Sequence, residues 1–469
     1  MRTGRTMRYY LLSLGCCKNT VDSEGMSRLL QQAGYAPTEH PAAAEVLIVN
    51  TCGFIDIAQE ESFGALRELA RAKRRGQLLI AAGCLSQSHG HELAQEVPGL
   101  DGIIGARRWM EITALVEKLA SDGHRPLVMI GDPPAPPVGS ISRSVVQGAS
   151  AYLKIADGCS ASCSFCSIPM IKGPARSRPV EAVVGEARQL AAQGVKEIIL
   201  IAQDTTAYGR DRGQHDALPR LIEAILKAAP ELPWLRLMYA YPQHITPRLI
   251  ETMTQHPQVC HYLDIPLQHA HPETLRRMNR PHGVEKVRRL IANLRQAMPD
   301  IALRTSFIVG YPGETEEEFK ALLDFVEEIA FDRVGVFTYS REGGTPAAGL
   351  PGQVPDQVKE ERSQRLMELQ QGISLAKNHQ MVGRTLDVLV EGSGDGLSVG
   401  RSYRDAPEVD GLVLVKEELP LGEIVPVLIT GAMEYDLIGV RALCWQPAWF
   451  GIYFIVWAGL HELLQRITA

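Results

Sequence analysis

Short apolar runs, separated by helix-length segments, recur along the chain from Tyr9 to Ser340. Continuous apolar runs are typical of parallel strands buried on both faces, whereas half-exposed strands alternate apolar and polar residues. The runs of the first series are YYLLSLG (9–15), EVLIVNTC (45–52), QLLIAAGC (77–84), DGIIGA (101–106) and RPLVMIG (125–131). This pattern predicts a doubly wound α/β domain over residues 7–131.

A second β/α series follows residues 132–148, a segment rich in Pro, Gly and Ser that we interpret as a linker. Its apolar runs are AYLKIAD (151–157), EIILIAQD (197–204), WLRLMYA (234–240), HYLDIPLQ (261–268), ALRTSFIVG (302–310) and RVGVFTYS (333–340). Six such units are too few for a complete eight-fold barrel, so we expect a partial TIM-like (β/α)6 barrel over residues 149–380. Its active site is expected at the carboxyl ends of the strands.

The last part of the chain changes character after a long helical stretch. Five short β runs separated by turn residues predict a small five-stranded antiparallel β-barrel over residues 381–441. Residues 442–469 form an atypical hydrophobic tail, whose apolar core from Ala448 to Leu460 is shorter than the ~20 residues that span a bilayer. We therefore expect a docked or interfacial helix there rather than a membrane span.

Three cysteines in the segment DGCSASCSFCSIP, Cys159, Cys163 and Cys166, have CxxxCxxC spacing. Thiolates prefer iron–sulfur clusters and zinc, but zinc sites close with four ligands and this loop contains no fourth Cys or His. Three cysteines leave one iron of a 4Fe–4S cluster open. The loop is similar to that of radical S-adenosylmethionine (SAM) enzymes, in which SAM chelates the open iron. Phe165 fills the aromatic position of that motif.

Three further cysteines each end one of the first apolar runs, namely Cys16, Cys52 and Cys84. In a parallel α/β sheet these run ends share one edge, where ligands bind. A single cysteine at a strand end is usually a small buried hydrophobic residue, but three at equivalent positions favour a shared site. The pattern predicts a second three-cysteine cluster site, again with one open coordination position.

Glycines in RTSFIVGYPGET, which ends the fifth strand of the barrel, permit close approach of the backbone to a ligand. We expect Gly310 to contact the cofactor, although an ordinary strand–turn–helix connection is the alternative. We assign further cofactor contacts to Phe165, Gln203 and Ser306.

These residues resemble the methylthiotransferase family, which consists of radical SAM enzymes with two clusters. The pattern G-C-x-K-N with a following D-S-E begins at Gly15, the pattern N-T-C-G-F spans residues 50–54, and G-C-L contains Cys84. The resemblance covers residues 7–441 and implies a methylthiotransferase domain, a radical SAM barrel and a TRAM barrel. It also implies two 4Fe–4S clusters and SAM as cofactors.

Within this family, the chain is most similar to the branch that modifies an aspartate of the twelfth small-subunit ribosomal protein. The stretches that carry this similarity are DGCSASCSFCSIP, GPARSRP, LIAQDTTAYG, DIPLQH and GRSYRDAPEVDG. The resemblance implies insertion of a methylthio group at the β-carbon of that aspartate. Arg176 and Arg178 are candidates for orienting its carboxylate by bidentate pairing, and the alternative is that both are surface arginines.

The predicted barrel at 381–441 is acidic, which bears on the substrate. It contains five basic residues, at 384, 401, 404, 416 and 441, and eleven acidic ones, at 387, 391, 395, 405, 408, 410, 417, 418, 423, 434 and 436. RNA phosphates require Lys and Arg, so this charge favours a basic ribosomal protein over tRNA. The alternatives are a tRNA adenosine methylthiotransferase and a non-enzymatic iron–sulfur RNA-binding protein.

The remaining expectations concern partners, location and the other cysteines. We expect the ribosomal protein, free or in the small subunit, an electron donor such as flavodoxin or ferredoxin, a sulfur donor and no tRNA. The amino terminus lacks a signal-peptide pattern, which favours a cytoplasmic protein whose nine cysteines do not form a disulfide framework. Because neighbours on an extended chain project to opposite sides, Cys16 is the expected ligand and Cys17 is not. Cys260 and Cys444 are expected only to pack.

Overall fold

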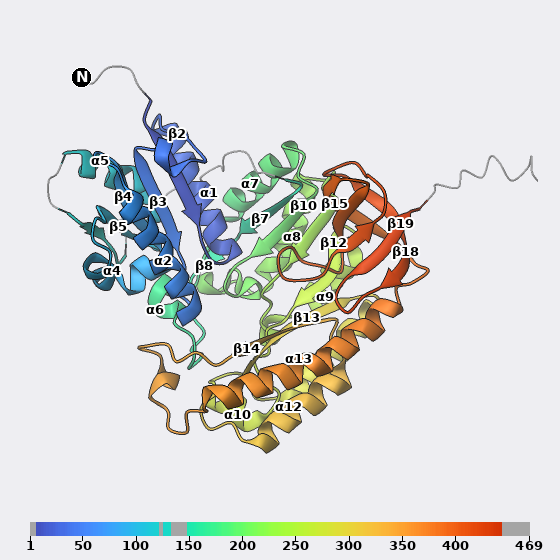
Figure 1. The fold of residues 1–469 in the computed structure, drawn as a ribbon. Helices are drawn as coiled ribbons and strands as arrows, with labels where there is room; N and C mark the ends of the chain where they lie inside the picture. The colour runs from blue at the N-terminus through green and yellow to red at the C-terminus, as the bar shows by residue number, and fades with distance from the viewer. Residues whose placement is uncertain (1–5, 122–124, 133–147, 443–469) are drawn as a thin grey trace, which may run out of the picture.

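A computed structural model describes residues 6–121, 125–132 and 148–442. Figure 1 shows the N-terminal domain in blue, a central domain in green and yellow, and a C-terminal barrel in red. Most of the expected linker and of the hydrophobic tail, including Cys444, lies outside the described residues. Within the described part of the chain, no helix is long and apolar enough to cross a membrane.

The N-terminal domain is a parallel sheet with helices on both faces, as predicted. Its strand order is β2-β1-β3-β4-β5-β6, with β1 (Arg8–Ser13), β2 (Ala36–Pro37), β3 (Val46–Thr51), β4 (Leu78–Gly83), β5 (Gly102–Gly105) and β6 (Leu127–Met129). The helices are α1 (Cys17–Gln32), α2 (Asp56–Ala72), α3 (Cys84–Ser88), α4 (Gly90–Glu96) and α5 (Ile112–Ser121). Because successive strand residues face opposite sides, Val46 and Ile48 pack under α1 and α5, while Leu47 and Val49 pack under α2, α3 and α4. The short edge strand β2 was not predicted.

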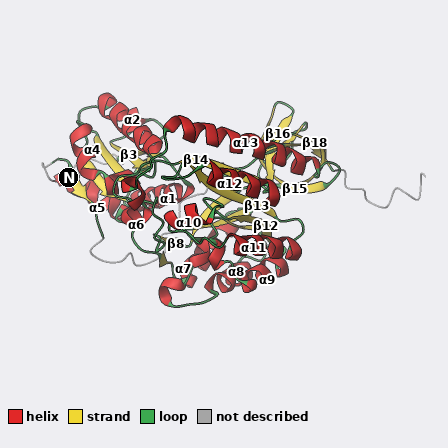
Figure 2. Ribbon diagram, turned by 90° about the horizontal axis from the view of Figure 1, so that it is seen from below, coloured by secondary structure: helices red, strands yellow, loops and turns green. Residues whose placement is uncertain are grey.

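The central domain is a six-stranded parallel sheet of order β14-β13-β12-β11-β10-β7. Its strands are β7 (Ser150–Lys154), β10 (Glu197–Ile201), β11 (Trp234–Leu237), β12 (Val259–Asp264), β13 (Ala302–Val309) and β14 (Arg333–Thr338). The helices are α6 (Ile168–Lys172), α7 (Val180–Ala192), α8 (Ala217–Ala228), α9 (Pro247–Gln255), α10 (Pro272–Arg277), α11 (Val284–Ala297), α12 (Glu316–Ile329) and α13 (Asp356–His379), and β8 (Ala156–Asp157) pairs with β9 (Arg176–Ser177). Since β7 and β14 remain unpaired with each other in the described residues, the predicted partial barrel is confirmed. Figure 2 shows α11, α12 and α13 beside this sheet.

The C-terminal barrel is closed and five-stranded, in the order β15-β16-β17-β19-β18. Its strands are β15 (Thr385–Gly394), β16 (Leu397–Ser402), β17 (Val413–Val415), β18 (Ile424–Ala432) and β19 (Leu437–Arg441). One detail of the prediction is wrong, because β17 and β19 pair in parallel while the other four pairs are antiparallel. An odd number of strands cannot alternate direction around a closed ring, so one pair has to be parallel.

The connection between β16 and β17 attaches this barrel to the central domain. Ala406 is fully buried in a cluster with Tyr262 and Cys260 on the inner face of the central sheet. The Tyr262 hydroxyl donates a hydrogen bond of 2.7 Å to the Asp410 carboxylate. Deeper in the same interface, the guanidinium groups of Arg236 and Arg401 hold the pKa of Glu197 at about 2, although burial alone would raise it.

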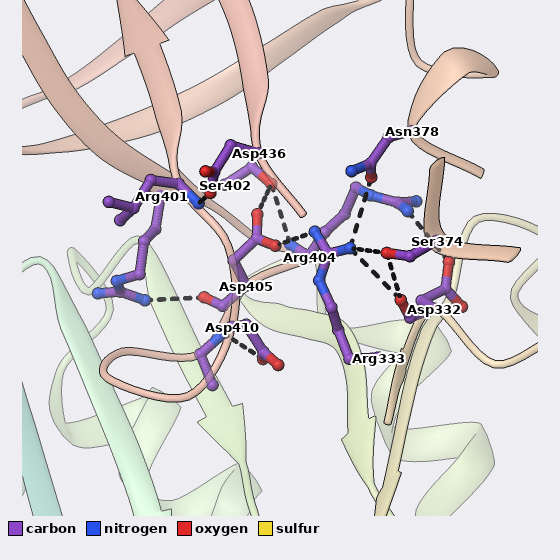
Figure 3. Close-up of polar contacts among 12 residues, drawn as sticks. Asp332, Arg333, Ser374, Asn378, Arg401, Ser402, Arg404, Asp405, Asp410 and Asp436 are labelled. Carbon is purple, nitrogen blue, oxygen red and sulfur yellow. Dashed lines mark hydrogen bonds and ion pairs between the residues drawn. The ribbon is translucent and has the colours of Figure 1, made fainter. Parts of the chain in front are cut away.

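Buried ion pairs complete this interface (Figure 3). Asp405, which is 1% exposed, accepts from Arg333 on β14 at 2.7 Å and from the Ser402 hydroxyl at 2.9 Å. Arg404 donates to Asp332 at 3.0 Å. Because both partners of each pair are removed from water, loss of one partner leaves a buried charge without compensation.

We expect Asp405→Asn to reduce the free energy of unfolding by roughly 3–5 kcal/mol, since it leaves the Arg333 guanidinium buried without its carboxylate. Thermal or denaturant unfolding of the holoenzyme measures the change. Asp387→Asn, at an exposed position on β15 of the same barrel, is the matched control and should leave stability unchanged. Equal stability of both variants would show that the ion pair contributes nothing.

Candidate cluster and cofactor sites

The three N-terminal cysteines lie at one edge of the sheet, as their positions in the sequence predict. Cys16 caps α1 after β1, Cys52 follows β3, and Cys84 begins α3 after β4, and these three strands are neighbours. The sulfur atoms are close enough for each charge to affect the others, because Cys16 and Cys52 both act on the pKa of Cys84. The fold therefore brings together residues that are far apart in the sequence.

Asn19 and a glycine hold the loops of this site in place. The Asn19 amide donates to the carbonyl oxygens of Leu14 and Thr51 at 3.0 and 2.9 Å, and its own oxygen lies 3.6 Å from Cys84 Sγ. Gly15 has φ +88°, and a Cβ there would lie 2.9 Å from Cys52 Sγ. A side chain at position 15 would therefore push Cys52 out of the site.

The chemistry of these thiols fits an iron–sulfur cluster. Burial raises the pKa of Cys52 and raises that of Cys84 to about 12, so both thiols are protonated at neutral pH until a metal replaces the proton. Within the described ranges, no three His, Cys, Asp or Glu side chains converge closely enough for a single metal ion. A cluster needs less convergence, because each cysteine binds a different iron.

The second cysteine site is the loop between β8 and α6 in the central domain. Cys159, Cys163 and Cys166 are partly buried, and burial raises the pKa of Cys166 to about 12. The backbone N–H of Ala161 points to Cys159 Sγ at 3.4 Å. A backbone N–H that points at a sulfur stabilises its thiolate, which is the form that binds the iron of a cluster.

Arg280 is a residue of this site that the sequence reasoning missed. Its Nη1 lies 3.8 Å from Cys163 Sγ, and its guanidinium stacks 4.2 Å above the centre of the Tyr241 ring. The positive charge lies beside the loop that we predict to bind an anionic cluster. No sequence pattern links position 280 to a loop more than a hundred residues earlier, so only the folded chain identifies it.

Two of the predicted SAM contacts have surroundings that fit the assignment. Gln203 donates to Asp157 at 3.3 Å, while its buried Oε1 has no hydrogen-bond partner in the described chain. Since a buried acceptor without a partner is costly, a ligand donor at this point would stabilise it. Phe165 packs beside Tyr311 and Tyr339, so it supports the loop between the second and third cysteines.

The surroundings of Ser306 and Gly310 give no direct support for contact with SAM. Ser306 is buried and accepts from Arg304 at 3.3 Å. Gly310 has φ +71°, and a Cβ there would lie 2.3 Å from Cγ of Lys359 on α13. Packing against α13 accounts for this glycine, and contact of either residue with SAM stays a prediction.

The two candidate substrate arginines differ in their surroundings. Arg178 donates to the backbone oxygen of Lys154 and pairs with Glu186, both at 2.7 Å. With its guanidinium engaged by these two groups, Arg178 is poorly placed to bind a substrate carboxylate in a bidentate manner. Arg176 is exposed on β9 and stays the better candidate.

Cys16 and Cys17 do not lie on one extended strand, as the sequence pattern had suggested, because a helix begins at Cys17. Cys16 is extended and exposed, whereas Cys17 is the first residue of α1 and is 5% exposed. Cys17 Sγ lies 3.4 Å from the hydroxyl of Tyr239 in the central domain. Cys260 is likewise buried, on the inner face of the central sheet.

We expect Cys17→Ser to retain the full iron content and Cys16→Ser to lose about half of it, because one of two four-iron clusters depends on Cys16. Iron analysis of the reconstituted variants measures this. Equal iron loss in both variants would contradict the assignment of Cys16 as the ligand.

An open parallel β/α sheet with a three-cysteine loop after its first strand defines a radical SAM enzyme. The model of the Radical SAM superfamily matches residues 153–326, that of uncharacterized protein family UPF0004 matches 8–105, and that of the TRAM domain matches 382–441.

The curated relatives identify the family more closely. The ribosomal protein uS12 methylthiotransferase RimO of Roseiflexus sp. (strain RS-1) is 52% identical over 457 residues, which cover 92% of this chain and 97% of that protein. RimO of Chloroflexus aurantiacus is 52% identical over 458 residues, 92% and 99% of the two chains. The chain therefore belongs to the RimO family of methylthiotransferases.

This membership confirms the branch inferred from the sequence, together with its cofactors, SAM and two 4Fe–4S clusters. Among solved structures, the radical SAM methyltransferase TsrM from Kitasatospora setae has a TM-score of 0.57 at 17% identity, covering 86% of this chain and 82% of its own. That similarity concerns the fold alone.

Proposed function

We propose that this protein inserts a methylthio group at the β-carbon of an aspartate of ribosomal protein uS12. The observation that carries the proposal is the pair of three-cysteine sites, each at the carboxyl edge of a parallel sheet, in a chain of the RimO family. Cys159, Cys163 and Cys166 would hold the cluster that binds SAM. The auxiliary cluster would be held by Cys16, Cys52 and Cys84.

When bound, the clusters and SAM supply the radical and sulfur chemistry that an unactivated C–H bond requires and that side chains cannot provide. The chain's own residues hold and orient these groups. Asn19 fixes the loops of the auxiliary site, and Gln203 offers a buried acceptor next to the SAM loop. Arg280 places a fixed positive charge beside Cys163.

The C-terminal barrel supports a protein substrate over tRNA. Two of its five basic residues, Arg401 and Arg404, are buried and paired within the protein, as Figure 3 shows for Arg404. These two guanidinium groups are not available to RNA phosphates. The exposed acidic residues of the barrel are Asp387, Glu391, Asp395, Glu408, Glu417, Glu418 and Glu423. This surface repels RNA and attracts a basic ribosomal protein.

The same proposal covers the state of the substrate, the location of the reaction and the donors of electrons and sulfur. The substrate is uS12, free or assembled in the small subunit, and the reaction takes place in the cytoplasm. Flavodoxin or ferredoxin supplies the electrons, and a separate donor supplies the sulfur, because the reaction consumes both.

Mass spectrometry of a deletion strain tests the function. Loss of the methylthio group from uS12, with tRNA nucleosides unchanged, is the expected result. Loss of a methylthio-adenosine from tRNA with uS12 unchanged would replace this proposal with the tRNA-modifying alternative.

A further inference from the structure

Four charged side chains lie at the interface between the N-terminal and central domains. Lys172 Nζ is 2.9 Å from Asp22 Oδ2 and 3.8 Å from Asp157 Oδ2. Lys154 Nζ pairs with Asp22 and lies 3.1 Å from Asp157. We call these four residues the interface quartet. Asp22, Lys154 and Lys172 are at most 8% exposed, so their interactions are little screened by water.

Three members of the quartet lie close in the chain to a cysteine of a cluster site, and the fourth, Lys154, ends β7. Asp22 is on α1, the helix that Cys16 caps. Asp157 precedes Cys159 by two residues, and Lys172 ends α6, which begins just after Cys166. The quartet therefore joins the two cysteine sites through short, rigid segments.

The position of α6 brings Lys172 next to the N-terminal cysteine site. Ile171 packs against Cys84 and Ala106. Arg107 fixes the end of α6 by donating to the backbone oxygens of Ile171 at 2.9 Å and Met170 at 2.6 Å. Lys172, the residue after Ile171, therefore lies where α6 meets the N-terminal cysteine site, and its buried ammonium pairs with Asp22.

Electrostatics at Cys84 agree with this placement. Burial raises the pKa of Cys84 to about 12, and the charge of Lys172 is the largest influence in the opposite direction. Asp22 acts on Cys84 more weakly and with opposite sign. The geometry carries the same assignment, because Lys172 is the lysine of the quartet that belongs to α6, the helix whose Ile171 packs against Cys84.

We propose that Lys172 is a positioning residue of the Cys16/Cys52/Cys84 site, where its buried ammonium favours binding of a small anionic sulfur ligand at the position that the three cysteines leave open. This inference rests on the proposed function, which requires sulfur at that site. Asp22 and Asp157 hold the ammonium in place, and the low dielectric of the interface strengthens its attraction for an anion.

The test is a titration of the reconstituted full-length holoenzyme with methanethiolate, followed by electron paramagnetic resonance. Lys172→Met should weaken methanethiolate binding about tenfold, equivalent to ~1.4 kcal/mol. Lys172→Arg keeps the charge and should restore binding toward the wild-type value. Iron content should stay unchanged in both variants.

Two further variants distinguish a role of Lys172 in binding the sulfur ligand from a purely structural contact between the two domains. Lys154→Met is the matched control, because it removes the other lysine that pairs with Asp22 but keeps the lysine of α6. Its methanethiolate affinity should equal that of the wild type. Asp22→Asn keeps a side-chain oxygen that can accept the hydrogen bond from Lys172 but removes the opposing negative charge, so it should tighten binding. It also provides the test if Lys172→Met fails to fold.

Equal weakening in Lys154→Met and Lys172→Met, or weaker binding in Asp22→Asn, would overturn the inference and leave the quartet a structural contact. Unchanged affinity in Lys172→Met with full iron content would overturn it as well. A wild-type holoenzyme that incorporates only one cluster would instead contradict the proposed function itself, so the two failures are distinguishable.

Discussion

Cys159→Ala should reduce formation of 5′-deoxyadenosine from SAM to background. Its thiolate is one of the three proposed cluster ligands in the loop after β8, and burial already opposes ionisation of the thiol. A cluster held by the two remaining cysteines would have two irons without protein ligands, so we expect iron content to fall from about eight to about four per chain. Chromatography of the reaction products and iron analysis measure both effects.

Cys260→Ala is the control for this variant. Cys260 is also a buried cysteine of the central domain, with a pKa raised to about 12 by burial, but it lies on β12 away from the loop. Its replacement should leave iron content and SAM cleavage intact. A Cys159→Ala variant that still contains both clusters would remove the basis for assigning this loop to SAM.

Cys52→Ala should separate the two halves of the reaction. The variant should still cleave SAM, because the cysteines of the central domain are untouched, but it should transfer no methylthio group to uS12. Cys52 lies at the edge of a different sheet, after β3, where its backbone N–H donates to the Ser62 hydroxyl at 3.0 Å. Loss of a buried ligand there removes the auxiliary cluster while the central sheet keeps its own packing.

The measurement combines the mass of uS12 with the amount of deoxyadenosine formed. Ser62→Ala is a useful companion, since it removes a hydrogen bond to the Cys52 backbone without removing the thiol and should lower transfer only partly. If Cys52→Ala lost both activities, the N-terminal site would be structural and the two-site model would fail.

The sequence was a good guide wherever the chemistry depends on neighbours in the chain. The spacing of Cys159, Cys163 and Cys166 places three thiols in one loop whatever the rest of the fold does. The positions of Cys16 and Cys84 at run ends were equally informative, because the ends of parallel strands meet at one edge.

Contacts between residues that are far apart in the sequence were not predicted. Arg280, which follows α10, lies beside Cys163 although more than a hundred residues separate the two in the sequence. The ion pair between Arg404 and Asp332 also joins segments that the sequence separates widely. Patterns of apolar residues predict elements, but they do not say which charged side chains meet once the elements pack.

By itself, the sequence indicated the three domains and the two sets of cysteines, because periodicity and spacing are properties of the chain alone, and the enzyme class followed from the resemblance of its motifs to a known family. Tertiary structure alone decided that Cys17 faces the other domain, that one barrel pair is parallel and that α6, which ends at Lys172, packs against Cys84. These outcomes follow from closure of a ring and from packing of α6 on α3, which bring together residues that no local rule connects.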